Sequence, residues 1–192
     1  MHQSIDGNAK GHPMQRAMFL EYLSDRTTHH LDRQYMLGPA LLVAPVFVPE
    51  GEASEYYLPA GRWTAFFQPA RTLAGPAWVR EVVPIDQIPV WVRQGSVLCL
   101  GPAEVGRPDY DYAGAGLEVQ VYELEEGQTA KTVVPSGKGN ETAGVVEAKV
   151  QGGELVVSVA SGSVALASVS YFAGGQVKKA EATGQGVISL KV

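Results

Sequence analysis

Two acidic residues, Glu21 and Asp25, are the side chains of this sequence best placed for acid–base chemistry. Glu21 lies near the end of an apolar run over residues 13–22 that predicts a buried strand, and α/β folds place reactive groups at such strand ends. A glycosidase needs two carboxyl groups that face each other across a sugar, which two acids on one short turn seldom do. The sequence favours a structural interpretation, in which Asp25 caps a helix. Glu21 would then pair with an arginine such as Arg16 or Arg33.

Other catalytic and ligand-binding motifs are missing from the sequence. A metal site needs His and Cys at fixed short spacing, but no two of the four histidines stand four residues apart and Cys99 is the only cysteine. Ser96 lacks the second glycine of a nucleophile elbow, and there is no glycine-rich phosphate loop. We therefore predict no catalytic residue, no metal site and no cofactor, and we expect Cys99 to be a buried, unreactive thiol.

Aromatic residues gather between positions 56 and 91. Five of them could form a sugar-stacking platform: Tyr56, Tyr57, Trp63, Phe66 and Phe67. Packing between two sheets is the interpretation that the sequence favours. On this interpretation the three tryptophans, Trp63, Trp78 and Trp91, fill a core.

Composition limits the classes of partner. The chain has 192 residues, 45% of them hydrophobic, which is ample for one large or two small cores. A net charge of −5 without a basic stripe predicts no nucleic-acid partner. No apolar run approaches the roughly 20 residues of a membrane span, and residues 1–10 do not resemble a signal peptide. The compartment stays open, with the cytoplasm slightly favoured.

The first 38 residues predict a strand followed by a helix, and the helix ends before residue 38. The strand covers residues 13–22, and apolar residues at helical spacing predict a helix over residues 26–37 that Gly38 and Pro39 end. Such a βα unit is too small to bury its own faces. We therefore expect it to belong to a larger sheet.

The rest of the chain predicts two antiparallel β units joined by a Gly- and Pro-rich crossing over residues 101–116. Turns are predicted at Pro49-Glu50-Gly51, Pro59-Ala60-Gly61 and Gln94-Gly95. Strands of the first unit are predicted at 41–48, 55–58, 62–67, 77–83, 89–92 and 97–100. Strands of the second are predicted at 117–124, 132–134, 144–150, 154–159, 165–172 and 186–192.

Five ordered blocks over residues 12–101 carry a resemblance to a known family: PMQRAMFLEY, LDRQYMLG, LLVAPVF, YYLPAGRWT and IPVWVRQGSV. In order and spacing they resemble the C-terminal part of glycoside hydrolase family 31. The continuation Arg107-Pro108-Asp109-Tyr110, followed by a β domain, resembles the α-xylosidase branch more than the α-glucosidases. One departure is Tyr22-Leu23-Ser24-Asp25-Arg26, where the family usually has an aromatic residue followed by Pro-Asp-Asp.

The resemblance implies a mainly β chain of three parts. Residues 1–38 would be the last strand and helix of a truncated (β/α)₈ barrel, residues 39–102 a proximal β-sandwich, and residues 103–192 a distal β-sandwich. The family's retaining mechanism uses an aspartate nucleophile and an aspartate acid/base on earlier barrel strands. Those positions fall before residue 1, so neither role passes to a residue of this chain.

The expected function is therefore that of the C-terminal part of a retaining, α-xylosidase-like glycosidase that is inactive alone. Its expected partners are the missing barrel portion, other subunits and an oligosaccharide. The alternative is a stand-alone β-sandwich module that binds carbohydrate or has a structural role.

Overall fold

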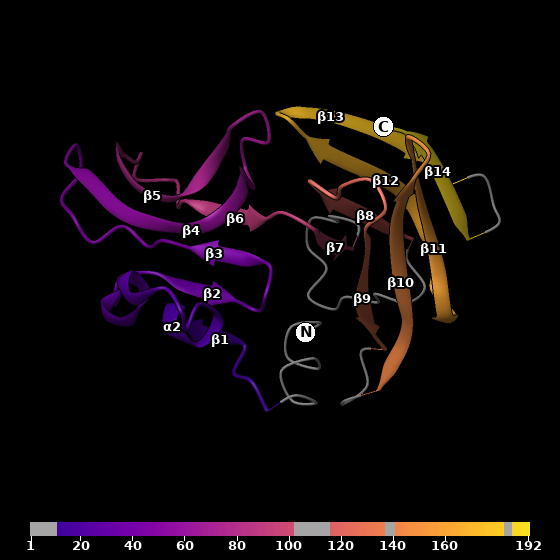
Figure 1. Cartoon of the computed structure of the whole chain (residues 1–192), viewed down its shortest axis with the longest axis horizontal. Helices are drawn as coiled ribbons and strands as arrows, with labels where there is room; N and C mark the ends of the chain where they lie inside the picture. Colours follow the sequence, from indigo (N-terminus) through magenta and orange to yellow (C-terminus); the bar gives the residue numbers. More distant parts are fainter. Residues whose placement is uncertain (1–10, 102–115, 137–140, 183–185) are drawn as a thin grey trace.

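The computed structural model describes residues 11–101, 116–136, 141–182 and 186–192 (Figure 1). Over these ranges the protein is mainly β, with one six-stranded sheet and two four-stranded sheets. Figure 1 shows the six-stranded sheet, coloured indigo to magenta, beside a second unit built from the later strands. In the described ranges, no helix has the length and apolar character that a membrane crossing requires.

The six-stranded sheet is antiparallel throughout, in the order β1-β2-β3-β6-β4-β5. The first unit therefore has a single six-stranded sheet, whereas the sequence predicts two sheets packed as a sandwich. Its strands are β1 (Gln15–Ala17), β2 (Tyr35–Leu37), β3 (Leu41–Val43), β4 (Ala53–Ala65), β5 (Thr72–Val82) and β6 (Val90–Arg93).

The N-terminal segment differs from its prediction. The strand expected over residues 13–22 is confined to β1, and the chain then turns into the short helix α2 (Met18–Glu21). The expected helix over residues 26–37 is also wrong: a 3-10 helix covers Arg26–His30, and β2 follows. Strand pairing overrides the helical spacing here, because β2 lies between β1 and β3 and buries Met36 in the sheet core.

Strands β4 and β5 form a long hairpin that bends in its middle. Between the pairs Leu58↔Ala77 and Gly61↔Gly75, two residues of β4 lie opposite the single residue Pro76 of β5. This arrangement is a β-bulge, which bends the bulged strand and increases its twist. The predicted turn at residues 59–61 is therefore wrong, since the chain bends there without reversing, as the curved ribbon of β4 shows (Figure 1).

Gly75 allows the two strands to approach each other at this bend. A Cβ atom added at Gly75 would overlap the backbone carbonyl groups of Pro59 and Leu58. Because the clash is with backbone atoms, a larger residue could be accommodated only by opening the bend.

The second unit packs two four-stranded sheets face to face. One sheet has the order β14-β11-β10-β9 and the other β13-β12-β8-β7, in which β8 and β12 run parallel. Fully buried aliphatic side chains from both sheets, such as Val119 and Val157, form one core. The strands are β7 (Ser96–Leu100), β8 (Leu117–Tyr122), β9 (Thr129–Pro135), β10 (Thr142–Gln151), β11 (Glu154–Gly162), β12 (Leu166–Ala173), β13 (Gln176–Glu181) and β14 (Val187–Lys191).

Strand β7 lies in the second unit, although the sequence predicts it as the last strand of the first. It pairs with β8 from Ser96↔Tyr122 to Leu100↔Glu118. The chain enters the second unit at the short turn Gln94-Gly95. There the amide of Gly95 donates to the carbonyl of Tyr122 at the end of β8 (2.7 Å). The two units are therefore joined by consecutive strands.

Two of the three tryptophans occupy the predicted core. Trp63 and Trp91 are buried, and the Trp63 indole donates to the carbonyl of Pro59 (2.8 Å). Trp78 is 54% exposed, so its prediction as a core residue is wrong. It lies on the edge strand β5, where it contacts Tyr57 across the hairpin (ring centroids 5.3 Å apart).

The Gly75→Ala variant tests whether the bend is a fixed feature of the fold. We expect it to lower the free energy of unfolding by about 3 kcal/mol, because the new methyl group meets backbone that cannot rotate away. Gly51→Ala is the control: its φ of +84° is strained but its Cβ would meet nothing, so its cost should be about 1 kcal/mol. Equal urea midpoints for the two variants would contradict this account.

The thiol of Cys99 provides a second test of the packing. Cys99 is half-buried on β7, and burial raises the pKa of its thiol from 9.0 to about 12. At pH 8 the thiolate population should therefore be about a thousandfold lower than in the unfolded chain. Ellman's reagent should react slowly with the native chain and faster as the pH rises toward 12. A native rate within tenfold of the urea-unfolded control would refute this.

Candidate functional site

The two acidic residues singled out in the sequence are both held by neighbouring groups. Glu21 forms an ion pair with Arg16, whose Nε also donates to the carbonyl of Pro13 (2.9 Å). Asp25 accepts the amide of Thr27 (3.0 Å) as a helix cap and the hydroxyl of Tyr57 (2.8 Å). These are the structural roles that the sequence favours for the two carboxylates.

Metal-binding geometry does not occur in the described ranges, where no three His, Cys, Asp or Glu side chains converge. The predicted aromatic platform is also divided. Tyr56, Tyr57 and Trp63 are buried, whereas Phe67 is 66% exposed and contacts Phe66 edge to face (centroids 5.0 Å apart). Of that group, only Phe67 presents most of its ring to solvent.

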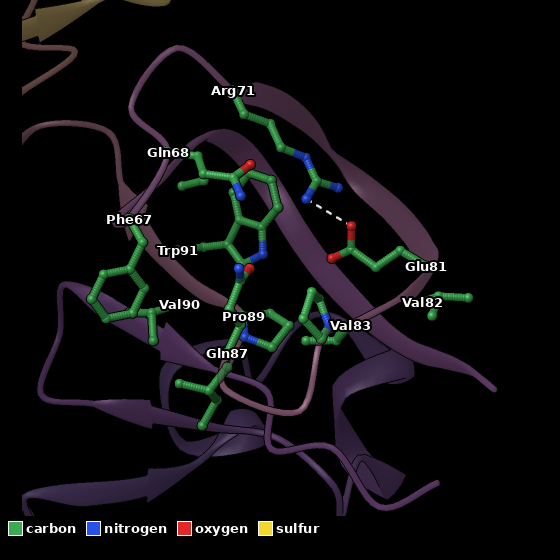
Figure 2. A pocket seen from close by; sticks show the side chains of 13 residues that line it. Phe67, Gln68, Arg71, Glu81, Val82, Val83, Gln87, Pro89, Val90 and Trp91 are labelled. Atoms are coloured by element: carbon green, nitrogen blue, oxygen red, sulfur yellow. Dashed lines mark ion pairs between the residues drawn. The ribbon is translucent and has the colours of Figure 1, made fainter. Parts of the chain in front are cut away.

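The candidate site is a cavity of about 290 Å³ between the β4–β5 connection and the β5–β6 connection (Figure 2). One part of its wall is apolar and consists of Trp91, Val90 and Pro89, which β6 and the segment before it supply. Phe67 lies on one side of Trp91 in Figure 2, and the Arg71–Glu81 pair lies on the other. Four polar side chains reach the same space: Gln68, Arg71, Glu81 and Gln87.

A chain of hydrogen bonds fixes one wall of the cavity. The indole Nε1 of Trp91 donates to the hydroxyl of Tyr56 (3.0 Å), which donates in turn to Oε1 of Glu81. Oε2 of Glu81 pairs with Nη1 of Arg71 at 2.7 Å. Burial raises the pKa of Tyr56 above its ordinary value, and the bond to Glu81 raises it further. Tyr56 is therefore a neutral donor that orients the carboxylate.

Arg71 also covers the indole of Trp91. Its guanidinium carbon lies 4.9 Å from the ring centroid, within the range of a cation–π contact. Its backbone is fixed by two hydrogen bonds, from the Arg71 amide to the carbonyl of Gln68 (2.8 Å) and from the Ala65 amide to the Arg71 carbonyl (2.9 Å). The cation is thus held by its charge partner, by the ring below it and by its own backbone.

The bent hairpin is what brings Arg71 and Glu81 together. A straight strand with the eleven residues of β5 would extend over about 35 Å. Arg71 precedes β5 and Glu81 lies near its end, yet the two side chains are in contact. Sequence reasoning missed this pair because nine residues separate its members along the chain. A signal for the bend was available in the sequence. It is the segment Pro59-Ala60-Gly61, which lies opposite Gly75-Pro76, so that Pro and Gly interrupt both strands at the same level.

Tyr56→Phe tests the hydrogen-bond chain behind the cavity. The variant removes the acceptor of a buried indole N–H, so we expect the free energy of unfolding to fall by about 2 kcal/mol. Tyr122→Phe is the matched control, because the Tyr122 hydroxyl donates only to the half-buried Gln120 (2.7 Å). Its cost should be below about 1 kcal/mol in the same urea titration. A Tyr56→Phe variant as stable as the control would contradict the proposed network.

Two family models match the chain. The model described as "Glycosyl hydrolase family 31 C-terminal domain" matches residues 11–98. The model described as "Alpha-xylosidase YicI, C-terminal domain" matches residues 111–192.

The chain is also similar to parts of longer curated relatives. The chain is 35% identical over 157 residues to alpha-xylosidase XylQ of Lactiplantibacillus pentosus, a match covering 78% of this chain and 19% of that protein. It is 44% identical over 89 residues to the isomaltosyltransferase of Sporosarcina globispora, covering 46% of this chain and 8% of that protein. The chain thus spans a fifth or less of the length of these relatives.

The fold also occurs in a solved structure. The crystal structure of the GH31 alpha-xylosidase (Xac1773) from Xanthomonas citri aligns with 98% of this chain and 22% of that chain, with a TM-score of 0.70 and 24% sequence identity. Taken with the two consecutive family models, these matches establish that the chain belongs to glycoside hydrolase family 31 and corresponds to its C-terminal domains.

Proposed function

We propose that this chain is the non-catalytic C-terminal part of a retaining, α-xylosidase-like glycosidase. The catalytic aspartate pair would be supplied by a barrel outside these 192 residues. Support comes from the two matched C-terminal domain models and from the similarity to XylQ. In this proposal residues 1–38 adjoin the barrel, residues 39–102 form the proximal domain and residues 103–192 form the distal domain.

The observation that carries the proposal is an apolar surface around β1 and α2. Met14, Phe19, Leu20 and Leu23 are between 42% and 70% exposed, and we call them the N-terminal apolar surface. Strand β1 is the last strand at this edge of the described sheet. An exposed apolar cluster beside an open strand edge is typical of a docking surface. We infer that the barrel covers this surface, with β1 and α2 at the contact.

Two polar atoms of this segment are buried without a hydrogen-bond partner among the described residues. Nη2 of Arg16 and the hydroxyl of Tyr22 have no hydrogen-bond partner in the described part of the chain. Burial also raises the pKa of Tyr22 to about 12, so its hydroxyl stays protonated and requires an acceptor. An acceptor from a docked barrel could reach these atoms only after this segment rearranged.

Hydrolysis by the purified chain is the direct test. We expect no release of aryl alcohol from aryl α-xyloside or aryl α-glucoside beyond that of a heat-inactivated sample, even at high protein concentration. The physical reason is that Glu21 and Asp25 are both engaged by structural partners. Turnover proportional to protein concentration, and abolished by Glu21→Gln or Asp25→Asn, would overturn the proposal.

A second candidate function is glycan binding without hydrolysis. The cavity in Figure 2 favours it, because polar side chains converge there on an apolar wall. The two functions are compatible, since a non-catalytic domain can hold a substrate chain.

A further inference from the structure

We propose that the cavity between Phe67 and the Arg71–Glu81 pair binds one ring of a neutral oligosaccharide. The inference rests on the proposed function only for the class of glycan, and it requires neither the barrel nor hydrolysis. It assigns a binding role to Phe67, Gln68 and Gln87, which have no part in the proposed docking of the barrel.

The size of the cavity suits a single sugar ring. Its volume of about 290 Å³ lies just below the range typical of small-molecule pockets, which starts at about 300 Å³. A longer segment of glycan would extend beyond this volume. An oligosaccharide would therefore enter with one terminal or branch residue and leave the rest in solvent.

The cavity wall offers partners both for the C–H face of a pyranose and for its hydroxyl groups. Phe67 offers an exposed aromatic ring, and Pro89 and Val90 add apolar surface against which the C–H face of a sugar can pack. The carboxamides of Gln68 and Gln87 each provide a donor and an acceptor at the cavity. Sugar hydroxyls both donate and accept, so they can use both kinds of group.

The charges favour a neutral ligand over an anion. Arg71 and Glu81 are the two charged side chains among the residues that line the cavity, and they neutralise each other at 2.7 Å. An isolated arginine would attract phosphate or carboxylate, but here the ligand would have to displace Glu81. Instead the pair presents N–H donors and carboxylate acceptors side by side, which a pair of neighbouring hydroxyls can bridge.

These groups are held in place before a ligand arrives. Glu81 is oriented by the Tyr56 hydroxyl, Arg71 by the Trp91 ring, and Phe67 by its edge contact with Phe66. Binding would therefore immobilise few additional side chains, which lowers its entropic cost.

A second aromatic hollow, of about 280 Å³, lies beside Trp78 and Phe47. It is lined by residues 30–34, which adjoin the segment that we propose the barrel covers. We therefore assign the glycan to the Phe67 cavity and use the other hollow as a control. Phe47 is 64% exposed and Phe67 66%, so the two residues form a matched pair for substitution.

The experiment is an NMR titration of the full 192-residue chain with a xyloglucan heptasaccharide and, separately, with methyl α-glucopyranoside. We expect saturable shifts of the Trp91 indole N–H with at least one of these probes. Phe67→Ala should weaken binding about tenfold, because it removes the stacking ring without disturbing a buried group. Phe47→Ala should leave the affinity within about twofold of the parent chain.

Three outcomes would overturn the inference. The first is the absence of saturable shifts with both glycans, and the second is an equal loss of affinity in the two phenylalanine variants. The third is a saturable Trp91 shift with inorganic phosphate in place of the glycans, which would indicate an anion site. None of these outcomes bears on the hydrolysis assay, so this inference and the proposed function can fail separately.

Discussion

The close approach of Gly75 to the backbone of Pro59 is the contact on which the cavity depends. It allows the β4–β5 hairpin to bend at the bulge opposite Pro76, and the bend brings the two ends of β5 toward each other. The Arg71–Glu81 pair forms across that gap and closes over Trp91. A straight hairpin made of the same residues would leave all three side chains on an open sheet face. Backbone packing at Gly75 therefore positions two side chains that lie four and six residues away from it along the chain, Arg71 and Glu81.

The second unit braces the segment that carries Phe67. The short turn at Gln94-Gly95 joins β6 to β7, and a small apolar cluster that includes Val92, Tyr122 and Phe172 fills the junction between the sheets. The β12–β13 turn also reaches back, because a Cβ at Gly175 would lie 2.8 Å from the carbonyl oxygen of Ala70. The β4–β5 connection, which carries Phe67, is thus held by its own hairpin on one side and by the second unit on the other. The two units are in direct contact at this point.

Local chemistry was readable from the sequence, and long-range geometry was not. The β-rich class, the Asp25 cap and the resemblance to family 31 all follow from neighbouring residues or ordered blocks. The helix predicted over residues 26–37 fails because pairing with β3 outweighs helical spacing. Trp78 was assigned to a core because hydrophobicity alone does not say that β5 is an edge strand. The Arg71–Glu81 pair depends on a bend whose direction no local propensity specifies.

The N-terminal segment shows how the same physics connects sequence and fold. Residues 13–22 have the apolar pattern of a strand buried on both faces, but β1 has β2 as its only ladder partner in the described chain. Without a second neighbour the ladder ends at Ala17, and the Tyr22 amide bonds instead to the carbonyl of Met18 within α2. A partner that paired with the free edge of β1 would satisfy its backbone groups and cover the N-terminal apolar surface. A neighbour at this edge would account for both the short ladder and the exposed apolar surface, which is why we propose that the barrel docks there.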